Sequence, residues 1–171
     1  MIFQFFVSLL LSLIIIKSTM SFLKKYFLDL PNNRSSHEKP IPRAGGISFV
    51  ICGSFFSIIN GVWFPLICLP LSLVSLIDDY KGLNPILRYI TQALTCLLLI
   101  LNSKIYDDGL QDLSILSQII LIFVLILVGT AIINFINFMD GIDGILASCM
   151  TIVFVSLAIR YFPFLFPFIA A

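Results

Sequence analysis

Long apolar stretches, separated by short polar segments, make up most of this chain. Each stretch contains almost no charged residue, as is typical of helices that cross a bilayer. The stretches run from Phe3 to about Phe22 and over Ile47–Ile59, Phe64–Ile77, Ile86–Leu101, Leu113–Ile133 and Ile145–Phe162. We therefore predict an all-α, polytopic membrane protein of about six transmembrane helices, built as a single transmembrane domain over residues 1–171.

Composition supports this fold class. Hydrophobic residues account for 60% of the 171 residues and charged residues for 11%, and the mean hydropathy is +1.11. A soluble core of this size neither needs nor could cover so much apolar surface. The first stretch lacks a basic n-region and a small-x-small cleavage site, so we interpret it as a retained span rather than a signal peptide.

Basic residues concentrate on alternate sides of the predicted spans. One side carries Lys17, Lys24, Lys25, Arg34, Lys39, Arg43, Lys81 and Arg88, and the other carries Lys104 and Arg160. The positive-inside bias places the first side in the cytoplasm and the N-terminus outside. The net charge of +1 gives no indication of nucleic-acid binding, and contact with membrane lipids explains the basic residues.

Two acidic clusters fall on the predicted cytoplasmic side. The first is the pair Asp78 and Asp79 at the end of the third stretch, and the second is Asp140 and Asp143 after the fifth. An isolated aspartate pair more often ends a helix in a solvated turn. Two clusters on the same side favour a Mg²⁺ site, because this ion binds carboxylate oxygens together with substrate phosphates.

A polar stripe leads into the second acidic cluster. Thr130, Asn134 and Asn137 are spaced so that they lie on one face of a helix. For Asn134, an interhelical hydrogen bond is as good an explanation as a functional role. For Asp140 and Asp143 we favour function, because the glycine that follows each allows the backbone to approach a ligand closely.

Cations near these clusters have two explanations. Arg34, Lys39 and Arg43 lie in the first inner loop and could bind phosphates, although topology alone accounts for their charge. Arg88 stands one helical turn before Gln92, where it could pair with an inner aspartate, contact substrate or extend toward the membrane surface.

Three blocks of sequence together resemble one enzyme family. They are Asn33–His37 with Lys39–Gly46, then Leu76–Asp79, then Asn134–Gly144, which contains Asn-Phe-Met-Asp-Gly-Ile-Asp-Gly. This set resembles the polyprenyl-phosphate N-acetylhexosamine-1-phosphate transferases of glycosyltransferase family 4. The family includes undecaprenyl-phosphate GlcNAc-1-phosphate transferases and, more distantly, the phospho-MurNAc-pentapeptide transferase.

The resemblance implies a reaction and a set of roles. A sugar 1-phosphate would pass from a UDP-sugar to undecaprenyl phosphate with release of UMP, and Mg²⁺, or alternatively Mn²⁺, would be required. Asp78 and Asp79 would bind metal and activate the lipid phosphate, with Asp78 as the residue that orients or deprotonates it. Asn137, Asp140 and Asp143 would form the nucleotide and metal side, with Asn137 also a metal ligand.

Further expectations follow from the same resemblance. Lys39 and Arg43 would contact the pyrophosphate, and Asn134 and Asn137 would contribute to substrate binding. The protein would reside in the bacterial inner membrane with its active-site loops in the cytoplasm, acting in cell-envelope polysaccharide synthesis such as that of lipopolysaccharide or cell wall. Members of the family are longer, so we expect this chain to be the N-terminal part of a longer transferase, with little or no turnover on its own.

Two other classes are weaker matches. Residues 140–147 fit the opening of the CDP-alcohol phosphotransferase motif, but Ser148 replaces the arginine expected next and no aspartate follows Asp143. A transporter or a non-catalytic scaffold is the other alternative. A transporter would carry its ionisable groups at mid-span, whereas here they cluster at the predicted inner helix ends.

Overall fold

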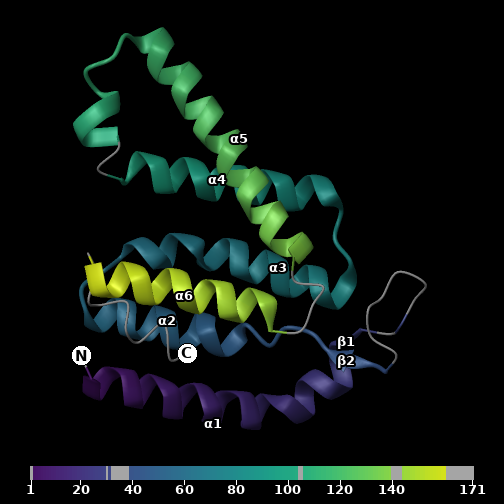
Figure 1. Cartoon of the computed structure of the whole chain (residues 1–171). Helices are drawn as coiled ribbons and strands as arrows, with labels where there is room; N and C mark the ends of the chain where they lie inside the picture. Colours follow the sequence, from purple (N-terminus) through teal and green to yellow (C-terminus); the bar gives the residue numbers. More distant parts are fainter. Residues whose placement is uncertain (1, 30, 32–38, 104–105, 140–143, 161–171) are drawn as a thin grey trace. The chain divides into compact units, whose positions relative to one another are not determined.

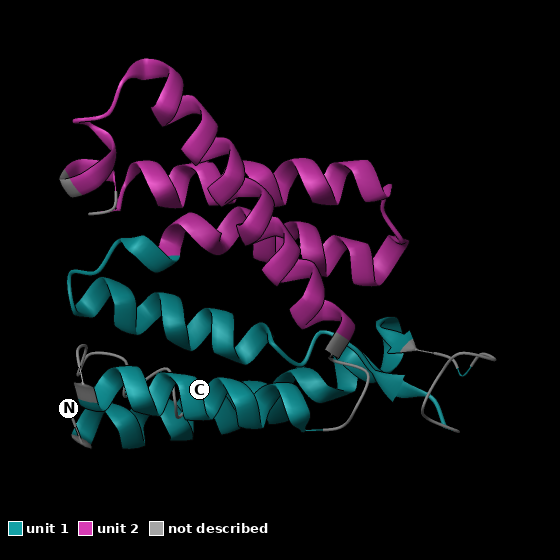
Figure 2. Ribbon diagram, turned by 45° about the horizontal axis from the view of Figure 1, so that its top comes forward, with its two compact units in different colours: residues 1–65, 139–171 teal, residues 66–138 magenta. Residues whose placement is uncertain are grey.

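The computed structural model describes residues 2–29, 31, 39–103, 106–139 and 144–160. Within these residues the chain is helical apart from one short strand pair, which confirms the all-α class (Figure 1). The elements are α1 (Ile2–Tyr26), β1 (Leu28–Asp29), β2 (Ile41–Pro42), α2 (Ile47–Ile59), the 3₁₀ turn η1 (Phe64–Cys68), α3 (Leu69–Lys81), α4 (Pro85–Leu101), the π-helical turn η2 (Tyr106–Leu110), α5 (Ile115–Met139) and α6 (Ile145–Arg160). They form two compact units, residues 1–65 with 139–171 and residues 66–138 (Figure 2).

In the first unit, α1 and α2 pack closely because small side chains line their contact. Ser8, Ser48 and Cys52 are buried, and the Cys52 Sγ lies 4.0 Å from the carbonyl oxygen of Ser8. Small residues let two helix backbones approach in a setting where apolar burial alone does not hold helices together. Phe154 of α6 stacks on Phe49 of α2, with ring centroids 6.0 Å apart.

A two-residue antiparallel ribbon joins the end of α1 to the segment before α2. Leu28 pairs with Pro42, and the Arg43 amide donates to the Phe27 carbonyl at 2.7 Å. This ribbon was not predicted from the sequence, because two-residue strands carry no recognisable alternation. The ribbon ties Arg43 to the end of α1.

In the second unit, α3 and α4 form a tight helical hairpin. Gly82 ends α3 in the left-handed conformation, at φ 65°, which only glycine adopts without strain. Asn84 caps α4 by accepting a hydrogen bond from the Ile86 amide at 3.0 Å, and Pro85 occupies the first turn. An asparagine cap followed by proline in the first turn is a favourable start for a helix, because the asparagine accepts an unpaired amide and proline has none to satisfy.

Helix boundaries differ from the predicted ones around the acidic pair. The stretch predicted as one helix from Phe64 instead begins with η1, because Pro70 lacks an amide hydrogen and fits only the first turn of the α-helix that follows. α3 then continues to Lys81, so Asp78 and Asp79 lie within its last turns rather than after it. Similarly, α5 extends to Met139 and includes Asn134 and Asn137.

Two described helices are long and apolar enough to cross a membrane, over Phe3–Tyr26 and Ile115–Phe138. Ile47–Ile59, Pro85–Leu101 and Ile145–Ile159 are apolar but shorter. The predicted number of about six full spans therefore finds support in two helices of the described chain.

Gly129 marks a close contact between α5 and α4. A Cβ added there would lie 2.8 Å from the Cys96 Sγ, which is closer than real Cβ contacts. We expect Gly129→Ala to lower the free energy of unfolding by about 1 kcal/mol through overpacking. In a Cys96→Ala background the new methyl group would occupy the volume left by the sulfur, so the same substitution should cost less. Thermal unfolding of the four proteins in detergent measures this difference, and equal costs in both backgrounds would contradict the contact.

Candidate active site

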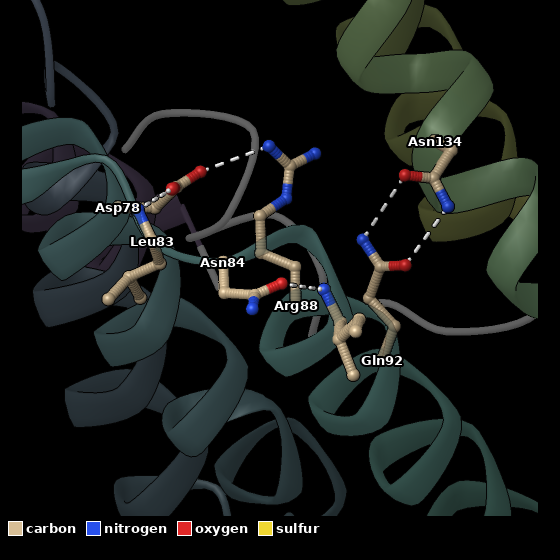
Figure 3. A network of polar contacts seen from close by, with 7 residues as sticks. Asp78, Leu83, Asn84, Arg88, Gln92 and Asn134 are labelled. Atoms are coloured by element: carbon tan, nitrogen blue, oxygen red, sulfur yellow. Dashed lines mark hydrogen bonds and ion pairs between the residues drawn. The ribbon is translucent and has the colours of Figure 1, made fainter.

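The carboxylate of Asp78 bridges the end of α3 and the start of α4. Its Oδ1 accepts a hydrogen bond from the Leu83 amide at 2.7 Å, and its Oδ2 accepts one from the Arg88 Nη1 at 3.0 Å (Figure 3). The Asp78 carbonyl also accepts from the Gly82 amide at 2.8 Å. The side chain and the backbone of Asp78 thus both hold the α3–α4 turn in place.

Arg88 is the cation of this ion pair. It lies in the first turns of α4, ten residues after Asp78, and its side chain is 39% exposed, whereas that of Asp78 is 20% exposed. Of the alternatives that the sequence left open for Arg88, the structure shows pairing with an aspartate, Asp78. A partly buried carboxylate loses part of its hydration, and a charged partner such as Arg88 offsets the free-energy cost of that loss.

One helical turn further along α4, a pair of amide side chains joins α4 to α5. The Gln92 Nε2 donates to the Asn134 Oδ1 at 3.4 Å, and the Asn134 Nδ2 donates to the Gln92 Oε1 at 3.0 Å (Figure 3). The Asn134 Nδ2 also donates to the Thr130 carbonyl at 2.8 Å within α5. Gln92 is 2% exposed, so this reciprocal pair satisfies an amide that is otherwise withdrawn from water.

The amide pair bears on the expected role of Asn134. From the sequence, an interhelical hydrogen bond and a functional role were equally good explanations for Asn134, and the structure shows the interhelical bond. Gln92 received no role from the sequence, although an amide inside an apolar helix, four residues after an arginine, was the available signal. A substrate contact by Asn134 stays a prediction.

The other expected site residues are distributed over the chain as follows. Asp79 is half-buried in the last turns of α3, and Asn137 is exposed near the end of α5. Lys39 and Arg43 are exposed in the other compact unit. Asp140 and Asp143, like Arg34, lie outside the described residues.

The described residues contain no group of three or more histidine, cysteine or acidic side chains that could hold a metal ion. The donor chemistry of Asp78 nevertheless suits Mg²⁺. A carboxylate has about four lone-pair positions, so one remains on each Asp78 oxygen after its hydrogen bond. The metal set Asp78, Asp79 and Asn137 stays a prediction.

Comparison with known proteins gives a consistent result. A family model described as Glycosyl transferase family 4 matches residues 61–166, the region that carries the Asp78–Arg88 and Gln92–Asn134 pairs. A curated relative, the undecaprenyl-phosphate alpha-N-acetylglucosaminyl 1-phosphate transferase of Thermotoga maritima, is 33% identical over 126 residues. The match covers 72% of this chain and 40% of that protein, so the chain spans well under half of its relative's length. No solved structure matches.

Proposed function

This chain belongs to glycosyl transferase family 4, and from that premise we propose that it serves the transfer of a sugar 1-phosphate from a UDP-sugar to undecaprenyl phosphate, with release of UMP. The sugar that we propose is an N-acetylhexosamine, because the relative from Thermotoga maritima is named for N-acetylglucosaminyl 1-phosphate transfer. Two helices long enough to span a membrane suit a lipid acceptor. We place the reaction at the cytoplasmic face of the bacterial inner membrane, in cell-envelope polysaccharide synthesis.

The observation that carries the proposal is the fixed acidic end of α3 within the region that matches the family. Asp78 is bound through both oxygens, and Asp79 follows it in the same helix turn. All three reactant groups, the lipid phosphate and the two phosphates of the donor, are anions that repel one another. Mg²⁺, when bound at this acidic end of α3 and at Asn137, would screen that repulsion and orient the phosphates.

The chain's own residues would contribute binding and proton transfer. Lys39 and Arg43 are exposed cations, as a pyrophosphate contact requires. An aspartate of the α3 pair would accept hydrogen bonds from, or take the proton of, the attacking lipid phosphate. Asp140 and Asp143 are proposed for the nucleotide side from their sequence motif.

The test is metal binding that depends on nucleotide. We expect UMP to raise the affinity of the folded chain for Mn²⁺ in lipid nanodiscs by at least about 5-fold, as two ligands sharing a site would. Electron paramagnetic resonance of free Mn²⁺ measures this, with AMP as the control nucleotide and helix content checked by circular dichroism. Mn²⁺ binding that UMP and UDP-GlcNAc both leave unchanged would contradict the proposal and favour a scaffold or a transporter.

A further inference from the structure

We propose that Asp78 is a positioning residue, which acts through Arg88 to fix the end of α3 in the proposed transfer site. The inference also includes Gln92, which lies on the same side of α4 as Arg88 and forms hydrogen bonds with Asn134 of α5. It rests on the proposed function, because the residues that it positions are those of the transfer site. It reverses the role that the sequence suggested for Asp78.

The contacts of Asp78 are those of a structural anchor. Its two oxygens are bound by groups from different elements, the Leu83 amide in the turn and the Arg88 guanidinium in α4. The ion pair with Arg88 and the bond from the Leu83 amide together hold the end of α3 against the start of α4. This is the geometry expected of a carboxylate that fixes two elements in place.

One face of α4 carries both connections. Arg88 and Gln92 are four residues apart and project from the same side of the helix. Arg88 reaches the acidic end of α3, and Gln92 reaches Asn134 of α5, as Figure 3 shows. α4 therefore sets the position of the α3 carboxylates relative to Asn134 and Asn137 of α5.

The bond between Asn134 and Gln92 also constrains the part of α5 that carries Asn137. The reciprocal bond to Gln92 fixes both the rotation of α5 and its height against α4, because two donor–acceptor pairs must align at once. Asn137 lies three residues further along the same helix. Its position is thus set by the amide pair one turn before it.

A double-mutant cycle on transfer activity tests the proposal. The variants are Asp78→Asn, Arg88→Gln and the double variant, with Arg88→Lys as the conservative change and Lys81→Gln as a matched control. Lys81 is an exposed cation in the last turn of α3. UMP release from UDP-GlcNAc is measured in membranes that contain the full polypeptide as the cell makes it, at temperatures where circular dichroism shows every variant folded.

If Asp78 acts through Arg88, each single variant should lower kcat about 10-fold and the double variant should be no worse than either, the coupling expected of residues in contact. Arg88→Lys should recover most of the rate, because an ammonium group can still donate to the carboxylate, and Lys81→Gln should match the unmodified protein. A role limited to fold stability would lower the unfolding temperature and leave kcat of the folded variants unchanged, which would overturn the proposal.

Other outcomes separate this inference from the proposed function. If losses for Asp78→Asn and Arg88→Gln multiply to about 100-fold in the double variant, Asp78 acts independently of Arg88 and only this inference fails. If Asp78→Asn lowers kcat far more than Arg88→Gln does, Asp78 takes part directly in the chemistry, and again only this inference fails. If the unmodified membranes transfer no sugar phosphate, both proposals fail, even where the unfolding temperatures of the variants still show coupling.

Discussion

Replacement of Asp79 by asparagine is expected to lower sugar 1-phosphate transfer by at least about 100-fold, the usual contribution of a general acid or base. Asn keeps the size of the side chain and removes its charge, so the helix end should remain folded. Asp79 is half-buried in the last turns of α3 and belongs to the site proposed for metal binding and proton transfer. UMP release in membranes measures the loss.

Asp112→Asn is the matched control for this experiment. Asp112 is an exposed aspartate after η2, at the opposite end of α4 from the acidic pair. Its substitution should leave the rate unchanged. If Asp79→Asn instead transfers sugar 1-phosphate at a rate within a few-fold of the unmodified protein, Asp79 has no direct role in the chemistry.

Replacement of Gln92 by leucine is expected to lower the free energy of unfolding by about 1–3 kcal/mol. The change leaves the Asn134 Oδ1 without its interhelical donor, while the Asn134 Nδ2 keeps only its bond to the Thr130 carbonyl. A buried polar atom without a partner costs more than the hydrogen bond itself contributes. Thermal or denaturant unfolding in detergent, monitored by circular dichroism, measures the effect.

The amide pair offers a sharp second variant. Gln92→Leu combined with Asn134→Leu removes both partners and should restore most of the stability, since two apolar side chains leave no polar atom unpaired between the helices. Thr91→Val serves as control, because the Thr91 hydroxyl bonds the Leu87 carbonyl within α4 and links no second helix. Additive losses in the double variant would show that the pair does not couple α4 to α5.

Local sequence signals predicted the parts of this fold that depend on neighbouring residues. The all-α class followed from the apolar stretches, and the stretch predicted over Ile86–Leu101 differs from the observed α4 by one residue at its start. The boundaries of α3 did not, because apolar composition continues through η1 and only Pro70 marks where the α-helix begins. Family membership was recognised from three short blocks, and the family model confirms it.

Long-range partners were the part that sequence could not assign. Arg88 had several credible partners, and its selection of Asp78 depends on the geometry of the Gly82 turn. Gln92 and Asn134 are 42 residues apart, and no local pattern relates them. The expected roles of Asp140 and Asp143 lie outside the described residues and stay predictions from their motif.

The short length of α2 bears on the prediction that this helix crosses the membrane. With 13 residues, α2 reaches only about 20 Å, against a hydrocarbon layer of about 30 Å. Its C-terminal end carries its own polar partners, since the Asn60 Nδ2 donates to the Phe56 carbonyl at 2.7 Å and Gln4 donates to Asn60 at 3.4 Å. A crossing by α2 would therefore require a locally thin bilayer, and bilayers of shorter acyl chains should accommodate such a crossing with less deformation.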